Sequence, residues 1–314
     1  MRFLNRLFGK KVLDEPASLS MNNDYRIKYQ KLFKDMEKSS IQLKIDKDFQ
    51  GECTVGRSKI GGNPDLPQNF KWFRYEGEHF SDGSIAERPL SFIAQINCSD
   101  ACKYDESGLL PTSGMLYFFY DMATNKWGFD PKDKGSAQVF YYAGDIAGLI
   151  RTKLPEDLPS EPYNFRIPET PIIFSCAMEI PDFEEFVQLC DDNVEYDSYD
   201  EYMDAAIQLG YKTEEDDFDK SKLLGYANLV QDGMLLECEC ASNGIYCGDR
   251  SVVDKYKQYK ENGKHWQLLF QLGSFNIGDY ELMWGDMGRI FYYVKIDDLK
   301  MLNFSDCWLV LQCG

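Results

Sequence analysis

The residues whose types could support catalysis are few in this chain of 314 amino acids, and histidine is the scarcest. Only His79 and His265 are present; His79 lies in a polar loop and His265 directly precedes Trp266. A serine or cysteine nucleophile needs an adjacent base, and the sequence lacks the Gly-x-Ser-x-Gly turn that presents a serine. The pattern disfavours triad and dyad chemistry, and we expect a protein that is not an enzyme.

Metal and cofactor motifs are also missing from the sequence. The ten cysteines are scattered; Cys98 and Cys102 are four apart, and Cys238 and Cys240, followed by Cys247, are expected on one face of a strand. These spacings are not Cys-x-x-Cys zinc knuckles, and the Asp-x-Asp-x-Asp-Gly loop of calcium sites is missing. No phosphate-binding Gly-x-x-x-x-Gly-Lys loop is found either. We therefore expect no metal, no cofactor and mostly reduced, buried thiols.

One local group of residues has the chemistry to bind a ligand. Trp284 and Asp286 flank Gly285, and Glu281 precedes them, which places an aromatic face and two carboxylates in one loop. Such a group suits a cationic or sugar-like ligand. The alternative is structural, with the tryptophan filling the sheet and the aspartate making a turn.

The second candidate surface is acidic. The net charge is −18, and residues 182–219 alone hold 15 Asp and Glu against the single Lys212. Such a charge repels nucleic acid and would attract a basic protein, although an acidic run is also typical of a solvated helix face. The side chains expected to make the contact are Glu184, Glu185, Asp191, Asp192, Glu214 and Glu215.

The elements that position these groups follow a pattern that occurs twice in the sequence. Residues 58–64, 90–96 and 114–120 have counterparts of similar composition, in the same order, at 221–226, 268–272 and 288–293. A repeat of this kind fixes the architecture before any chemistry is assigned. We expect an internally duplicated α+β fold, with two related, mainly antiparallel β units and helices at the N-terminus and in the middle.

Periodicity predicts the individual elements. A 3.6-residue apolar period predicts helices over residues 22–40, from Pro181 to Cys190, and from Ser198 to Gly210. Short apolar runs predict the strands, and residues 297–300 are expected to form a turn or short helix. The predicted strands are 90–96, 115–120, 139–142, 172–178, 234–240, 267–272, 289–295 and 307–312.

The composition also suggests how the chain is organised. We expect an N-terminal helical segment over residues 1–50, a first repeat over 51–181, an acidic helical connector over 182–219 and a second repeat over 220–314, which together form one compact body. No stretch reaches the roughly 20 apolar residues that span a membrane, and the N-terminus lacks a secretory signal. We expect a cytoplasmic protein; its oligomeric state is left open.

Several motifs, in order, resemble one bacterial family. They are Lys59-Ile60-Gly61-Gly62-Asn63-Pro64-Asp65-Leu66-Pro67, Leu90 to Asn97, Leu109-Leu110-Pro111 with Gly114, Ser242 to Gly248, Met283-Trp284-Gly285-Asp286, and the ending from Asp298-Leu299-Lys300 to Trp308 and Cys313. From about residue 50 onward the chain resembles the YwqG-like family. The resemblance implies a bacterial, intracellular, duplicated α+β protein with no agreed reaction, and related domains are sometimes grouped with immunity proteins.

The sequence thus supports two functional hypotheses. The first is a non-enzymatic interaction protein, immunity-like in that its acidic connector binds a basic protein. The alternative is a small-molecule-binding protein or weak hydrolase that uses a cleft between the two repeats.

Overall fold

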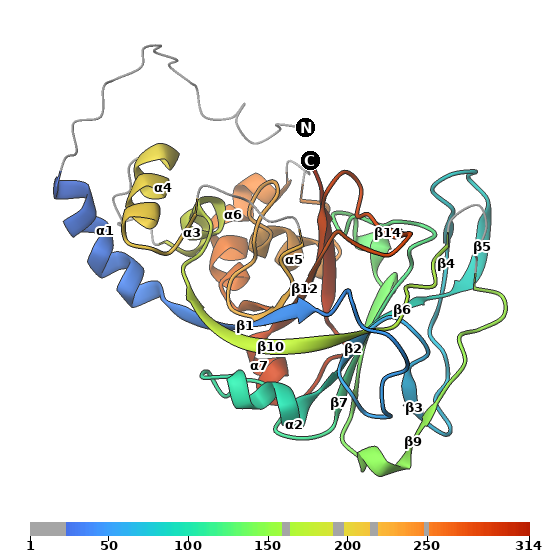
Figure 1. The fold of residues 1–314 in the computed structure, drawn as a ribbon. Helices are drawn as coiled ribbons and strands as arrows, with labels where there is room; N and C mark the ends of the chain where they lie inside the picture. The colour runs from blue at the N-terminus through green and yellow to red at the C-terminus, as the bar shows by residue number, and fades with distance from the viewer. Residues whose placement is uncertain (1–22, 159–163, 191–197, 214–218, 248–250) are drawn as a thin grey trace.

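The computed structural model describes residues 23–158, 164–190, 198–213, 219–247 and 251–314 (Figure 1). Its α-helices are α1 (Asn23–Met36), α2 (Cys98–Ala101), α3 (Phe183–Leu189), α4 (Tyr199–Gln208), α5 (Leu235–Ser242), α6 (Ser251–Gly263) and α7 (Ile296–Lys300). Its strands are β1 (Lys38–Ile45), β2 (Lys59–Ile60), β3 (Asp65–Pro67), β4 (Arg74–Glu78), β5 (Ile85–Pro89), β6 (Ser91–Asn97), β7 (Met115–Tyr120), β8 (Ala137–Tyr142), β9 (Leu149–Arg151), β10 (Thr170–Glu179), β11 (Lys222–Leu224), β12 (Trp266–Gly273), β13 (Phe275–Ile277), β14 (Tyr280–Leu282), β15 (Arg289–Lys295) and β16 (Trp308–Gln312).

Ten of these strands form one antiparallel sheet. The order is β16-β15-β12-β11-β1-β10-β2-β6-β7-β8, so the long strands β1 and β10 pair at its centre. Strands from the first predicted unit lie on the β10 side, and strands from the second lie on the β1 side. The two predicted β units therefore share one sheet, a point that the sequence left open.

The sheet curves back on itself, and its two ends enclose a common core. Phe118 of β7 packs on Phe270 of β12 with ring centroids 4.3 Å apart. The hydroxyl of Tyr292 in β15 donates a hydrogen bond to the carbonyl of Phe119 (3.1 Å). Strands far apart in the sheet order thus contact each other, and the sheet is nearly closed.

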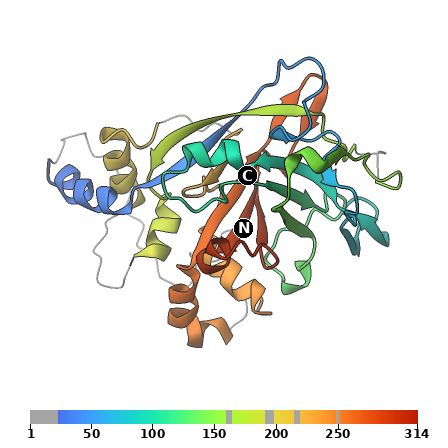
Figure 2. The same ribbon diagram turned by 90° about the horizontal axis from the view of Figure 1, so that it is seen from below.

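Helices α1, α3 and α4 lie together at one end of the sheet (Figures 1 and 2). Tyr29 and Phe33 of α1 pack against Tyr202 of α4, and all three rings are buried. Ser198 caps α4 through a capping box with Glu201. Helix α5 instead buries its apolar side on the outer face of β12, β15 and β16.

The two sides of the sheet have matching features. The β6–β7 pairing shifts register between Phe92 and Ala94, and the β12–β15 pairing shifts between Leu268 and Phe270. Both shifts lie midway along a long strand, directly before the buried glutamine that follows. A register shift of this kind bends a strand, so both sides curve at corresponding places.

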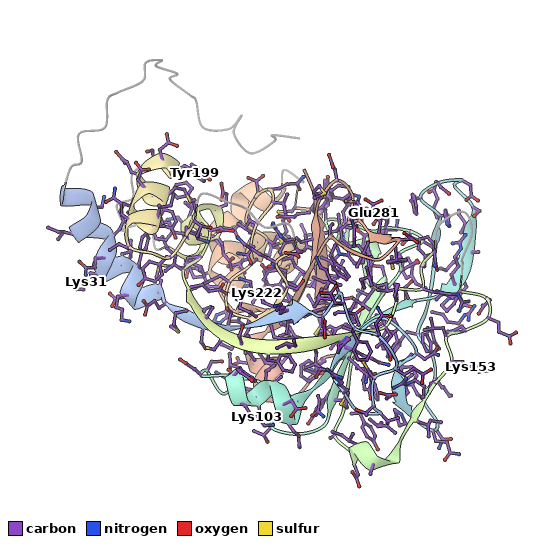
Figure 3. All side chains as sticks on the ribbon, viewed as in Figure 1. Lys31, Lys103, Lys153, Tyr199, Lys222 and Glu281 are labelled. Atoms are coloured by element: carbon purple, nitrogen blue, oxygen red, sulfur yellow. The ribbon has the colours of Figure 1, made fainter. Side chains whose placement is uncertain are left out.

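Buried lysines also occupy matching positions. Lys59 donates to the carbonyl of Asn63 (2.6 Å) and pairs with Glu169. Lys222 donates to the carbonyl of Tyr226 (2.8 Å) and pairs with Glu179 (2.6 Å). Figure 3 shows Lys222 in the interior, whereas Lys31, Lys103 and Lys153 lie at the periphery.

Most of the predicted strands are confirmed, but three stretches differ from the prediction. Residues 234–240 were expected as a strand and form helix α5, because a short apolar run does not distinguish the two. The N-terminal helix ends at Met36 rather than near residue 40, and residues 38–45 form the central strand β1. No element is predicted over the residues that form helix α6. Within the described ranges, no helix is long and apolar enough to cross a membrane.

Candidate functional site

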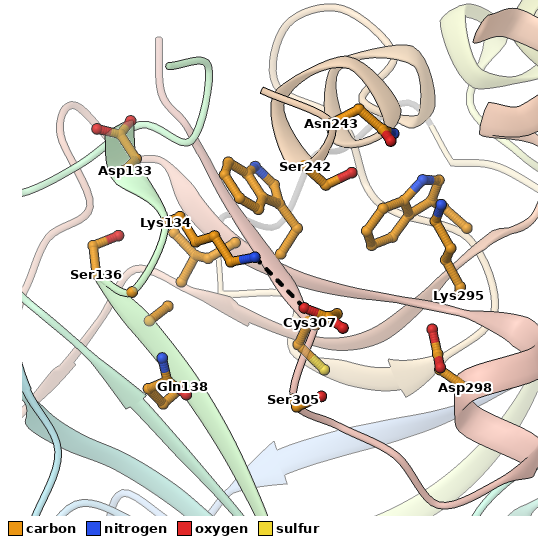
Figure 4. Close-up of a pocket in the computed structure, with 16 residues that line it drawn as sticks. Asp133, Lys134, Ser136, Gln138, Ser242, Asn243, Lys295, Asp298, Ser305 and Cys307 are labelled. Carbon is orange, nitrogen blue, oxygen red and sulfur yellow. Dashed lines mark ion pairs between the residues drawn. The ribbon is translucent and has the colours of Figure 1, made fainter. Parts of the chain in front are cut away.

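A cavity of about 440 Å³ lies where the two edge strands of the large sheet, β8 and β16, come near each other (Figure 4). Its wall combines residues from both ends of the sheet with the C-terminal end of α5. The lining residues are Asp133, Lys134, Gly135, Ser136, Ala137, Gln138, Ser242, Asn243, Trp266, Lys295, Asp298, Ser305, Asp306, Cys307, Trp308 and Leu309. Its volume lies within the range of ligand pockets.

Two tryptophans give the cavity an aromatic wall. Trp266 and Trp308 are the first residues of β12 and β16, and both are buried. The indole N–H of Trp266 donates to Glu239 Oε2 (3.0 Å), and that of Trp308 donates to the carbonyl of Gly128 (2.8 Å). Because each polar edge is bound inside the protein, both rings are held in fixed orientations.

A buried carboxylate holds a lysine beside the first ring. Lys295 Nζ lies 3.0 Å from Glu239 Oε2 and 5.3 Å from the ring centroid of Trp266. Glu239 is 4% exposed at its side chain, so this ion pair is better shielded than a surface pair. Lys295 therefore brings a positively charged, positioned group to the wall.

A second ion pair joins the two ends of the sheet across the cavity. Lys134, which precedes β8, lies 3.7 Å from Asp306, which precedes β16 (Figure 4). Both side chains are about two-thirds exposed, at 68% and 65%. Exposed pairs contribute little to stability, with typical values of about 0–1 kcal/mol. This pair can open to admit a ligand at small energetic cost.

The wall has polar groups suited to binding rather than to nucleophilic attack. Asn243 uses its amide N–H to bind the carbonyl of Glu239 (2.7 Å), and Asp298 accepts a hydrogen bond from Asn303 (2.9 Å). Burial, together with the nearby Asp298 and Asp306, raises the pKa of the Cys307 thiol. A thiol with a raised pKa is a poor nucleophile, because the thiolate is the reactive form.

The structure places the predicted Trp284 group elsewhere. Trp284 is 1% exposed, its indole N–H binds the carbonyl of Gly273 (3.2 Å), and its ring packs edge-on against Tyr120. Asp286 and Glu281 are exposed, and none of the three residues lines the cavity. Their placement supports the structural interpretation, in which the tryptophan fills the core.

The predicted acidic surface is only partly described. Glu184 is half-buried, and Glu185 is buried against the body of the protein rather than facing a partner. Asp191, Asp192, Glu214 and Glu215 lie outside the described residues.

The two histidines differ in their surroundings. His79 is buried, and its Nδ1 faces both the hydroxyl (2.9 Å) and the backbone N–H (3.2 Å) of Ser81. Asp82 approaches that same nitrogen at 3.8 Å. A catalytic triad needs serine and aspartate on opposite nitrogens, so this is a local turn. His265 is exposed.

Sequence reasoning missed the cavity because its lining comes from segments far apart in the chain. Some signal was present: Ser242 and Asn243 belong to one of the motifs described above, and Asp298 and Trp308 belong to another. Lys134 and Lys295 lie outside all of these motifs. Among the described residues, no group of three or more His, Cys, Asp or Glu could hold a metal ion.

The family model described as "Domain of unknown function (DUF1963)" matches residues 58–313. The chain belongs to the DUF1963 family. The match includes both sides of the sheet apart from β1, and every residue of the cavity lies within it. No curated protein matches this DUF1963 chain.

Proposed function

We propose that this DUF1963 protein binds a small polar ligand in the cavity between β8 and β16. The observation that carries the proposal is that two tryptophans with fixed rings and the positioned Lys295 converge there from separate segments. Pockets that bind small molecules combine apolar walls with a few well-placed polar groups. Ligand binding in a cleft was the alternative hypothesis from the sequence. The proposal now places it at Trp266, Trp308 and Lys295 rather than at Trp284, Asp286 and Glu281.

The wall restricts the ligand's chemistry. An indole face favours a flat apolar surface on the ligand. Lys295 favours an anionic or hydroxyl group, whereas Asp298 and Asn243 offer partners for hydroxyl or amino groups. A ring compound that carries both kinds of polar group, such as a sugar or a cyclic acid, fits this combination.

The experiment is a thermal-shift screen of the full chain against a metabolite library. A ligand at 100 times its dissociation constant stabilises a folded protein by about 2.7 kcal/mol, which is readily measured. We expect Lys134→Ala with Asp306→Ala to change the response, because both line the cavity and are too exposed for their loss to unfold the protein. The matched control is Lys132→Ala, an exposed neighbour that does not line it. The proposal fails if every hit stabilises these variants and the wild type equally.

We further infer that the two sides of the sheet derive from one duplicated unit, as the YwqG-like resemblance implies. The matching register shifts and buried lysines support this. So does an unusual backbone conformation: Gly61 (φ +58°) and Leu224 (φ +59°) follow the two lysines at the same spacing. A leucine rarely adopts positive φ, and a shared origin with a glycine position explains it. We also propose, from the same resemblance, that the protein is bacterial and cytoplasmic.

The acidic connector remains a second candidate, as an immunity-like surface for a basic protein. The supporting observation is that α4 exposes Asp200 and Asp204 on the side opposite its buried Tyr202. Reversing Glu214 and Glu215 to lysine should slow capture by immobilised poly-L-lysine at low salt, because electrostatic steering weakens. Reversing Glu76 and Glu78 on β4 is the matched control. Equal capture by both variants would remove this candidate.

A further inference from the structure

The C-terminal end of α5 reverses the chain sharply. Gly244 has φ +81°, its N–H binds the carbonyl of Ala241 (3.0 Å), and the N–H of Ile245 binds the carbonyl of Cys240 (3.0 Å). These two bonds form a Schellman motif, which ends a helix with a left-handed residue. The motif also brings Ile245 against Cys240, and both belong to one small apolar cluster.

The reversal brings Cys247 back to Cys240. Both thiols belong to the cluster formed with Leu236 and Tyr259, and their side chains hydrogen-bond to each other. This bond lowers the pKa of Cys240 and raises that of Cys247. A hydrogen bond to the sulfur of Cys240 favours its thiolate, the form that reacts with oxidants.

One thiol of this pair is accessible to an oxidant. Cys240 is buried, but Cys247 is partly exposed. A second close pair, Cys98 and Cys102, differs because its thiols donate to backbone carbonyls: Cys98 to Ile96, and Cys102 to Ser99 and Thr112. Burial also raises the pKa of Cys98.

We propose that Cys240 and Cys247 are a redox pair that hydrogen peroxide converts into a disulfide. The thiolate of the pair that peroxide reaches attacks one peroxide oxygen, the O–O bond breaks, and a sulfenic acid forms as hydroxide leaves and takes the proton released by the thiol to become water. The partner sulfur then attacks the sulfenic sulfur and expels a second water. In total, two thiols and one hydrogen peroxide give one disulfide and two waters; a dithiol reductant restores the two thiols and is itself oxidised to a disulfide.

The disulfide would also fix one wall of the cavity. Ser242 and Asn243 lie between the two cysteines and line the cavity, so we expect oxidation to alter ligand affinity. This consequence rests on the proposed function, but the disulfide does not. Mapping the bond directly therefore tests the redox pair even if no ligand is found.

The experiment treats the reduced full chain with one to ten equivalents of hydrogen peroxide. Free thiols are then alkylated, the protein is digested, and the linked peptides are quantified by mass spectrometry. We expect a Cys240–Cys247 linkage that forms before other cysteine modifications and disappears after dithiothreitol. Dominant oxidation at another cysteine, or a Cys247 linkage to a different partner, would overturn the proposal.

Variants keep the result interpretable. Cys247→Ser should abolish the linkage, and this position tolerates a polar atom because it is partly exposed. Cys240→Ala provides a second test from the buried side. Cys176→Ser is the matched control, since that thiol is exposed and donates a hydrogen bond to Glu106 Oε1 (3.6 Å). Linkage that persists in Cys247→Ser, or is lost in Cys176→Ser, contradicts the assignment.

Discussion

The indole N–H of Trp308 donates a hydrogen bond to the backbone carbonyl of Gly128. Trp308 begins the edge strand β16, and Gly128 lies in the segment that connects β7 to β8 at the other end of the sheet. In the same segment, the carbonyl of Trp127 accepts a hydrogen bond from the N–H of Leu311 in β16 (3.1 Å). These contacts join the two ends of the sheet, and Trp308 also lines the cavity.

Gly128 should tolerate no side chain. Its φ is +84°, and a Cβ there would lie 2.0 Å from the carbonyl oxygen of Leu309. Backbone rather than a flexible side chain is in the way, so we expect Gly128→Ala to destabilise the protein by about 3 kcal/mol or more, combining positive-φ strain with displacement of β16. Chemical denaturation followed by tryptophan fluorescence measures the loss.

Gly108→Ala is the control that measures the cost of positive φ alone, without a steric clash. Gly108 also has positive φ (+64°), but nothing lies within 4 Å of its added Cβ. Its substitution should cost only about 1 kcal/mol. Equal losses at the two positions would show that the contact with β16 does not contribute.

Gln95 and Gln271 should be equally important to stability. The side-chain N–H groups of Gln95 bind the carbonyl of Arg57 (2.9 Å) and Asp65 Oδ2 (2.7 Å). Those of Gln271 bind the carbonyl of Lys220 (2.8 Å) and Asn228 Oδ1 (3.1 Å).

Both glutamines are completely buried. Replacing either one by leucine leaves buried partners unsatisfied, at about 1–3 kcal/mol for each such group. We expect similar losses at both sites in urea unfolding, and almost none for Gln208→Leu, which is exposed on α4. A large effect on one side only would weaken the inference of a duplicated unit.

Much of the sheet could be predicted from sequence because its strands are short, apolar runs. β7 and β15 are buried along nearly their whole length and have no competing helical pattern. Residues 234–240 are predicted as a strand because the alternation of Cys238 and Cys240 is typical of one. The structure has helix α5 there, which packs on the sheet and ends at the Gly244 turn. β1 was missed because its central place becomes clear only when both neighbouring strands are known.

The candidate site was less predictable than the fold. Trp284 was selected for its acidic neighbours, but its ring is used in the core. Lys134 and Asp306 are ordinary surface residues in the sequence, and only the curvature of the sheet brings them within 3.7 Å. A contact that depends on two distant strands coming together produces no pattern in the local sequence.

Replacing Leu302 by glycine should stabilise the protein. Leu302 follows α7 with φ +56°, its N–H binds the carbonyl of Leu299 (3.0 Å), and the N–H of Asn303 binds the carbonyl of Asp298 (2.9 Å). This is a second Schellman motif, in which glycine is the favoured residue.

The Leu302 side chain is 42% exposed, so little burial is lost. We expect Leu302→Gly to gain about 1 kcal/mol, seen as a higher melting temperature. Met301→Gly is the control, and it should lower the melting temperature. Met301 has φ −86°, so glycine there relieves no strain and only increases the conformational entropy of the unfolded chain. A lower melting temperature for Leu302→Gly would contradict the strain argument.

Glu185 should make the protein less stable as the pH rises from about 4.5 to 7. Its side chain is buried, and its Oε2 has no hydrogen-bond partner in the described part of the chain. Burial raises the pKa of Glu185 to about 7 against the opposing charge of Lys38; Asp182 acts in the same direction as burial, and Lys222 acts against it.

Between pH 4.5 and 7, Glu185 is protonated in the folded protein and ionised in the unfolded chain. The free energy of unfolding therefore falls as the pH rises through this range. The loss is at most about 3 kcal/mol, since one pKa unit corresponds to about 1.4 kcal/mol. We expect Glu185→Gln to flatten this part of the pH profile of urea unfolding and to be more stable than wild type near pH 8. Asp204→Asn, at an exposed position on α4, should keep the wild-type slope. An unchanged slope in Glu185→Gln would assign the pH dependence to other groups.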